Sequence, residues 1–541
     1  MRFFLRSLKE GITRHPGLAA ALCLALLLSV IGMNWGRVEC WNPDQMAHRK
    51  ISNQGLPKSY LKPPLHTYLN YGLVVWPVER VMGGILRLDK TWQYPVLLAG
   101  SRLITLAMFA ASVALLYGLA LGASGKTAAT VLALWAATSA GFIAFNHYLT
   151  ADMPLIFWML ASLFMAVRAA KTGRTLDAAL AGLLAGLAAA DKYNGLGVAA
   201  AIPAALFAAQ GWRFIRRPAP WVAGLAVLGG FALGNPGAVF DAQRFVEDFQ
   251  YNLLTTPVYT GKTEGSGYLA FLRNFPMLLG WPATVLLAAA LGIAGGAAVM
   301  RRWRREEAIL VAAAAVVFGF YFMTIGRFPR MATRFVLPAV PFLMLCALPA
   351  LRLIPWRHPA LLATAAALLV YNLACCLETG RHYLDDPRMA AQEWVKARVP
   401  EGARVENTYA PAWNKLRGVR VKAYSLPQAK GRVDRFNRLF EDNEIIQKGL
   451  SRYETGDSGD TFTEAALKRR NPDFITYTSF AFDYTGNEAA LEFYRKLDAQ
   501  SFGYRKVFDQ RARPIPWWSY PQNLDFIPAR MVILQRDGPA S

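Results

Sequence analysis

The sequence is short of charge and of cysteine. Only 18% of its 541 residues are charged, whereas 54% are hydrophobic, and a soluble protein of this length needs more charge to cover its surface. The five cysteines show no spacing typical of metal ligands, and Cys375 and Cys376 are neighbours in an apolar segment. They predict neither a metal site nor a disulfide framework. The composition excludes a soluble globular protein and predicts a polytopic α-helical membrane protein.

Acidic residues are scarcer than basic ones, which gives a formal net charge of +23. In a soluble protein such a charge would suggest nucleic acid as a partner. In this chain the basic residues of the first two thirds fall mostly in short connections between apolar blocks, as the positive-inside rule requires. We therefore predict membrane lipids, and no nucleic acid, as partners.

Apolar blocks long enough to cross a bilayer recur along the first 377 residues. They predict about eleven spans, at residues 17–34, 96–120, 127–145, 153–169, 176–191, 194–211, 219–235, 274–299, 308–325, 333–351 and 359–377. The first block follows a basic segment and lacks a small-residue cleavage site. We therefore expect an uncleaved helix that starts in the cytoplasm. Every second connection is basic, for example RRWRR at 301–305. The remaining connections are predicted on the outer side. The tail is predicted on the same side, because it follows an odd number of spans.

Two outer parts are large enough to carry structure of their own. Residues 35–95 form a mixed segment whose apolar piece, 66–82, contains Pro77, Glu79 and Arg80, so we expect juxtamembrane helices there. The tail, 378–541, has short strand-like runs at 473–477 and 531–535 and a helical stretch at 386–398. We predict a transmembrane catalytic domain, 1–377, and a soluble outer α/β domain, 378–541, that binds an acceptor or a partner.

Two acids at predicted outer helix starts are candidate catalytic groups. Asp44 follows an Asn-Pro turn, and Asp152 stands in TADMP with Pro154 behind it. Ionisable groups beside membrane segments are costly and call for a functional reason. Each acid can equally be a helix cap or a first-turn carboxylate without further function.

Five cations on the outer side are candidates for binding a phosphate. Lys62 precedes two prolines, Lys192 lies in ADKYNG between two spans, and a short loop carries the arginines Arg327, Arg330 and Arg334. Guanidinium and ammonium groups suit phosphate oxygens, and a phosphate-bearing lipid accounts for all of them. The alternatives are an interfacial lysine at 62, pairing of Lys192 with Asp191, and contact of the arginines with ordinary anionic headgroups.

The order of several short motifs resembles that of the GT-C membrane glycosyltransferases of the protein O-mannosyltransferase and lipid A aminoarabinose transferase type. The motifs are LKPPLHTYL after Asp44, the apolar segment 101–120, HYLTADMP, DKYNG and RFVLPAVPFL. The tail also resembles the bacterial relatives, in DDPRMAAQEWVKARVPEG and NPDFITY. The similarity covers nearly the whole chain and implies a GT-C fold.

This resemblance implies a sugar donor linked to a polyprenyl phosphate and transfer with inversion at the anomeric carbon. It places Asp44 and Asp152 at the reaction centre, and Lys62, Lys192 and the loop arginines on the lipid phosphate. Gln45 and Leu61 stand where relatives often carry carboxylates. Fewer carboxylates favour a reaction without a divalent metal or other cofactor, and they leave a neutral or acidic sugar at least as well supported as aminoarabinose.

We therefore expect a multi-pass enzyme of the bacterial inner membrane, with its N-terminus in the cytoplasm and its C-terminal domain in the periplasm. The acceptor is a glycolipid such as lipid A, a glycan or a protein. Two alternatives stay open: a transporter or flippase of a lipid-linked sugar, and a scaffold without activity. A transporter tends to show internal repeats and polar groups near the midplane, and neither is evident here.

Overall fold

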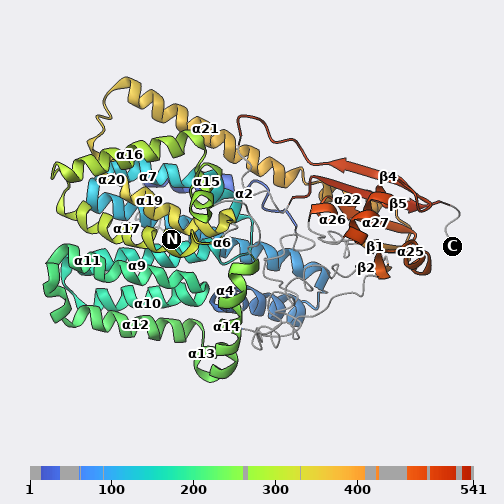
Figure 1. The fold of residues 1–541 in the computed structure, drawn as a ribbon, viewed down its shortest axis with the longest axis horizontal. Coiled ribbons are helices and arrows are strands. Elements are labelled where there is room, and N and C mark those ends of the chain that lie inside the picture. Colours follow the sequence, from blue (N-terminus) through green and yellow to red (C-terminus); the bar gives the residue numbers. More distant parts are fainter. Residues whose placement is uncertain are drawn as a thin grey trace.

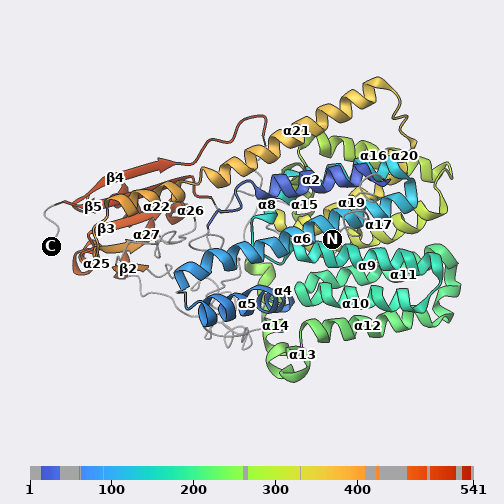
Figure 2. The same ribbon diagram turned by 180° about the vertical axis from the view of Figure 1, so that it is seen from behind.

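The computed structural model places a bundle of long helices beside a smaller α/β domain (Figure 1). It describes residues 14–36, 60, 62–88, 90–259, 266–328, 331–407, 422–425, 460–483, 488–519 and 527–537. Figure 2 shows from behind that α21 leads out of the bundle towards the α/β domain.

The bundle contains most of the apolar blocks of the sequence as helices. Its helices are α2 (Pro16–Val30), α6 (Lys90–Ser124), α7 (Lys126–Ala137), α8 (Ala140–Asn146), α9 (Asp152–Thr172), α10 (Thr175–Asp191), α11 (Ala201–Gln210), α12 (Pro218–Gly234), α16 (Trp281–Val299), α17 (Arg305–Ile325), α19 (Val340–Cys346), α20 (Leu348–Leu353) and α21 (Pro359–Leu384). In the described part of the chain, seven helical segments are long and apolar enough to cross a membrane. An eighth arises if α7 and α8, bent by 53°, form one span, and α2 and α12 are shorter apolar helices.

The expected count of about eleven spans is confirmed only in part. The clearest difference lies in the block 274–299, which the structure divides at Gly280 into α15 (Gly267–Leu279) and α16. Gly280 has φ of 89°, a backbone conformation that other residues rarely adopt. The backbone therefore ends one helix there although the apolar sequence continues.

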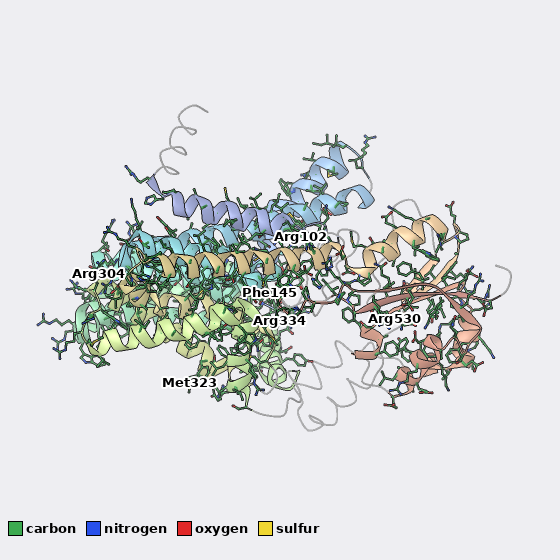
Figure 3. The ribbon with its side chains drawn as sticks, turned by 90° about the horizontal axis from the view of Figure 1, so that it is seen from above. Arg102, Phe145, Arg304, Met323, Arg334 and Arg530 are labelled. Atoms are coloured by element: carbon green, nitrogen blue, oxygen red, sulfur yellow. The ribbon has the colours of Figure 1, made fainter. Side chains whose placement is uncertain are left out.

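The basic connections meet at one end of the bundle. Arg304 marks this end in Figure 3, whereas Arg334 lies at the opposite end, which faces the α/β domain. Contacts across the basic end join connections far apart in the sequence: Lys171 Nζ donates to Gly122 O (3.0 Å), Arg305 Nη2 to Ala209 O (3.2 Å) and Arg352 Nε to Glu307 Oε1 (2.6 Å). The alternation of charge along the sequence thus corresponds to two ends of one bundle.

Helices α10 and α12 run parallel in very close contact. A Cβ atom on Gly182 would lie 2.1 Å from Ala223 O, and one on Gly186 would lie 2.2 Å from Val227 O. Only glycine permits this approach, because any side chain would overlap the backbone of α12. The contact brings the end of α10, and with it Lys192, against the elements that follow α12.

Short helices cover the end of the bundle that faces the α/β domain. One nearly continuous helical piece comprises α4 (Leu65–Asn70), the π-helix η1 (Tyr71–Val75), α5 (Trp76–Val78) and the π-helix η2 (Glu79–Ile85). Helices α13 (Gly237–Phe240) and α14 (Ala242–Tyr259) lie at the same end in Figure 1, and α18 (Thr333–Val336) contains Arg334, which Figure 3 places there. The helices expected within 66–82 are therefore present.

The tail contains a five-stranded sheet with the order β2-β1-β3-β5-β4. Strands β1 (Arg404–Asn407), β2 (Lys422–Ser425) and β3 (Phe474–Thr478) are parallel, and β4 (Tyr504–Arg511) and β5 (Arg530–Arg536) add antiparallel pairs. Helices α22 (Pro387–Arg398), α25 (Glu464–Arg470), α26 (Phe480–Asp483) and α27 (Glu488–Asp498) accompany the sheet. The runs 473–477 and 531–535 and the helix near 386–398 are found as expected.

A buried polar joint connects this sheet domain to the bundle. Helix α21 continues beyond residue 377 to Leu384, and Asp386 caps α22 by accepting from Arg388 N. The Trp35 indole donates to Asp386 Oδ2 (2.7 Å), and the fully buried Arg388 guanidinium bonds the same carboxylate. Both oxygens of the Asp386 carboxylate accept hydrogen bonds inside the joint, and these bonds fix α22 against the segment after α2.

Candidate active site

An ion pair joins two of the predicted site residues. Lys192 Nζ lies 2.6 Å from Asp152 Oδ1, and Thr150 Oγ1 donates to Asp152 Oδ2 at 2.8 Å. Asp152 is the first residue of α9, where the helix dipole stabilises negative charge. Lys192 follows the last residue of α10 in an extended conformation, with φ of −154°. The adjacent ends of α9 and α10 thus bring a carboxylate and an ammonium together from positions far apart in the chain.

The two partners differ in their access to solvent. Asp152 is 3% exposed, and a quarter of the Lys192 side chain is exposed. Both carboxylate oxygens of Asp152 are already engaged, so the pair is held in one geometry. The ammonium is therefore the member that an incoming ligand can reach.

Arg334 and Lys192 both contact the same aromatic ring. The Phe335 ring centroid lies 5.7 Å from Lys192 Nζ and 5.2 Å from Arg334 Cζ. An aromatic face attracts cations through its quadrupole, so one ring holds two positive groups near each other. Figure 3 shows Arg334 at the end of the bundle that faces the sheet domain.

Lys62 is positioned by a hydrogen-bonded residue just before it. Tyr60 N donates to Asp248 Oδ2 of α14 (2.7 Å), and Tyr193 Oη donates to Tyr60 O (2.5 Å). Tyr193 is the neighbour of Lys192, so these bonds tie the Lys62 segment to the end of α10. The prolines after Lys62 then stiffen the entry into α4.

Neighbouring groups shift the pKa of Lys62. The side chain is exposed, yet the protein atoms around it remove part of its hydration, and this loss lowers the pKa of the amine. The positive charge of Lys192 lowers the pKa further, whereas Asp152 raises it. Lys62, Lys192 and Asp152 are thus close enough to influence one another electrostatically.

Buried polar groups at the ends of α10 and α12 were not identified as site residues from the sequence. Asp191 is 1% exposed and Asn235 is 0% exposed. In the described part of the chain, neither Asp191 oxygen has a hydrogen-bond partner, and the same holds for the side-chain amide of Asn235. Lys192 therefore bonds Asp152 and not Asp191, the partner that the sequence offered as an alternative. A sequence signal existed for Asn235, a polar residue that directly ends an apolar block.

The remaining predicted residues have different outcomes. Asp44 and Arg330 lie outside the described residues. Arg327 is exposed in the turn after α17, and among the described loop arginines Arg334 is the one that shares an aromatic contact with Lys192. No group of three or more potential metal ligands gathers among the described residues. The absence of a divalent metal from the reaction stays a prediction.

Comparison with known proteins identifies the fold of the chain. Residues 97–233 match the family described as dolichyl-phosphate-mannose-protein mannosyltransferase. Two crystal structures of ArnT from Cupriavidus metallidurans are similar to this protein. Each match covers 96% of this chain and 99% of the ArnT chain. The complex with undecaprenyl phosphate has a TM-score of 0.52 at 14% identity, and the apo state has 0.54 at 13%. The chain has the GT-C glycosyltransferase fold.

The resemblance inferred from the order of sequence motifs is thereby confirmed. A third structure, the archaeal oligosaccharyltransferase AglB from Archaeoglobus fulgidus, has a TM-score of 0.46 at 13% identity and matches 92% of this chain and 73% of that chain. No curated protein matches the chain by sequence. Three cations gather at this site: Lys192 pairs with the buried Asp152, Lys62 lies within electrostatic reach of both, and Arg334 shares the Phe335 ring with Lys192. Such a group of positive charges suits an anionic ligand.

Proposed function

We propose that the chain is an inverting glycosyltransferase that moves a sugar from a polyprenyl-phosphate donor to an envelope acceptor. The observation that carries this proposal is the Lys192–Asp152 pair with Lys62 and Arg334 beside it. A fixed group of cations at one end of a membrane bundle suits a phosphate held at the membrane surface. The crystallised ArnT of the same fold binds undecaprenyl phosphate.

The cations serve the departing phosphate. When the bond between the anomeric carbon and the phosphate oxygen breaks, negative charge grows on the phosphate. Preorganised cations stabilise such charge in the transition state without further reorganisation. Lys62, Lys192 and Arg334 supply the positive charge. Asp152 acts as a positioning residue that holds the Lys192 ammonium.

Asp44 serves the acceptor in this proposal. It lies outside the described residues, and its role rests on its match to the acid of the first outer loop in GT-C relatives. An acceptor group attacks the anomeric carbon on the face opposite the phosphate and gives its proton to Asp44, while polyprenyl phosphate leaves. One displacement inverts the configuration of the sugar.

The reaction takes place on the outer face of the bacterial inner membrane in this proposal. The basic end of the bundle then faces the cytoplasm, and the cation site and the sheet domain lie on the periplasmic side. The acceptor is lipid A or another glycolipid, a glycan or a protein, and no metal is required.

Mass spectrometry of envelope lipids, glycans and proteins from cells with and without the protein identifies the transferred sugar as one lost mass. Proteoliposomes that contain the labelled donor then separate transfer from translocation. We expect Asp44→Asn and Lys62→Ala to lower the transfer rate about 100-fold or more. Lys126→Ala, which removes an exposed lysine at the basic end, is the matched control and keeps wild-type activity. Wild-type rates in both site variants, or lipid translocation without transfer, would refute the proposal.

A further inference from the structure

After β4 the chain leaves the sheet and runs back along α21. Between β4 and β5 the structure describes residues 512–519 and 527–529, and Figures 1 and 2 show the first of these segments extending from β4 beside α21. Two contacts fix its course. Arg513 Nε lies 3.1 Å from Glu378 Oε1, and the Tyr371 hydroxyl donates to Trp518 O at 3.0 Å.

These two contacts lie at different depths along α21. Glu378 is the first charged residue after the helix begins at Pro359, so it marks the end of the apolar section. Tyr371 precedes it by seven residues, which corresponds to about 10 Å along a helix. From Arg513 to Trp518 the loop therefore descends beside the part of α21 that is suited to lipid.

The tip of the loop presents apolar side chains to its surroundings. Trp517 is 95% exposed, and Ile515 and Trp518 are 42% and 37% exposed. On α21, Val370 and Leu377 are 66% and 42% exposed, so the tip and the helix both expose apolar side chains at this place. Tryptophan favours the zone between lipid headgroups and acyl chains, because its ring is apolar and its N–H is polar.

Part of the backbone of the tip needs no hydrogen bond from water. Pro514 and Pro516 have no N–H group to satisfy. Ser519 N donates to Pro516 O at 2.9 Å, and the Trp518 carbonyl accepts from Tyr371. These features lower the cost of placing the loop at the boundary between water and lipid, since unpaired backbone groups are costly in lipid.

We propose that loop 512–519 inserts its tip, with Trp517 and Trp518, into the lipid leaflet next to the sheet domain. The tip then lies at the boundary between phospholipid headgroups and acyl chains. Arg513 stays at headgroup level, where Glu378 and Asp385 pair with it (3.1 and 3.6 Å). The loop anchors the sheet domain at a fixed height over the end of the bundle, independently of any transfer reaction.

A fluorescent probe at the tip tests the insertion. The full-length protein carries Cys23→Ala and Cys40→Ala, because Cys23 is exposed and Cys40 is outside the described residues, whereas Cys346, Cys375 and Cys376 are buried. Trp517→Cys is labelled with the environment-sensitive dye NBD in phospholipid nanodiscs. Nanodiscs with a nitroxide on the lipid acyl chain near the headgroup are compared with unlabelled ones. We expect a blue-shifted emission and at least twofold quenching by the nitroxide.

The matched control is Arg511→Cys, an exposed position at the end of β4. Its probe should emit as in water and show no quenching by the nitroxide lipid. A second tip position, Ile515→Cys, guards against a local effect of replacing Trp517. If the probes at 515 and 517 emit as in water and are quenched no more than the probe at 511, the proposal is wrong.

Discussion

The ammonium of Lys192 lies 2.6 Å from the Asp152 carboxylate, although the two residues belong to different connections between helices of the bundle. Asp152 begins α9 and Lys192 follows α10, so the packing of these helices creates the pair. Because Thr150 engages the second carboxylate oxygen, the pair has little freedom. A fixed cation beside Lys62 and Arg334 is the feature on which the proposed chemistry depends.

Removing one member of this pair should cost more than removing both. Lys192→Met leaves the 3% exposed Asp152 without its counter-charge, and breaking a buried pair costs about 3–5 kcal/mol. We expect the low end of that range, since a quarter of the Lys192 side chain is exposed. Adding Asp152→Asn to Lys192→Met should recover part of the loss.

Thermal unfolding of the single and double variants in detergent gives the coupling energy. The transfer rate should fall in Lys192→Met and stay low in the double variant, because restoring stability does not restore the cation. Strictly additive effects on stability would show that the pair does not stabilise the protein.

The pH dependence of donor binding should reveal Lys62. Loss of hydration and the charge of Lys192 lower the pKa of Lys62, and only the protonated amine attracts a phosphate. As pH rises through this lowered pKa, the ammonium is lost and KM for the donor should rise. Lys62→Arg should move this alkaline limb to higher pH, because a guanidinium stays protonated.

Initial rates between pH 7 and about pH 10 at several donor concentrations measure this effect. Lys126→Arg, at the basic end of the bundle, serves as the control and should leave the profile unchanged. An alkaline limb at the same pH in Lys62→Arg and in the wild type would assign the titration to another group.

The close contact of α10 and α12 should not tolerate a side chain at Gly186. A Cβ atom there would lie 2.2 Å from Val227 O, so Gly186→Ala must push the helices apart. Overpacking of this kind costs about 1–3 kcal/mol. Gly229→Ala is the matched control on α12, because no atom lies within 4 Å of its added Cβ. Unfolding temperatures measured side by side decide the matter, and equal values would contradict the close packing.

Acid should weaken the sheet domain through Asp498. Burial raises the pKa of this carboxyl, but hydrogen bonds from Tyr477, Lys506 and Arg530 outweigh it and hold the pKa at about 2. The folded-state pKa is thus below the unfolded value of about 3.9. The stabilisation is complete above that unfolded value and is lost as pH falls towards 2.

Unfolding of the detergent-solubilised protein at pH 3 and pH 6 tests this dependence. Asp498→Asn should be less stable than the wild type at pH 6 and should lose less stability on acidification. Asp537→Asn, which changes an exposed carboxylate directly after β5, should behave as the wild type. A wild-type acid response in Asp498→Asn would show that other carboxylates govern it.

The pattern of charge predicted which connections share an end of the bundle. This prediction needs no tertiary structure, because the cost of moving cations across a membrane acts on each connection separately. Contacts such as Lys171 with Gly122 and Arg352 with Glu307 bear it out. The same reasoning singled out Asp152, Lys192 and Arg334, which the structure brings to one place. It did not find the break at Gly280, since apolar sequence continues on both sides.

The sequence by itself therefore determined the membrane class, the two ends of the bundle and the kinds of residue at the end that faces the sheet domain, because hydrophobicity and charge act locally along the chain. The tertiary structure alone decided that Lys192 pairs with Asp152 and not with its neighbour Asp191. It also decided that Trp518 lies beside Tyr371 and that the sheet has the order β2-β1-β3-β5-β4. These contacts join segments distant in sequence, and their geometry follows from how closely helices such as α10 and α12 pack.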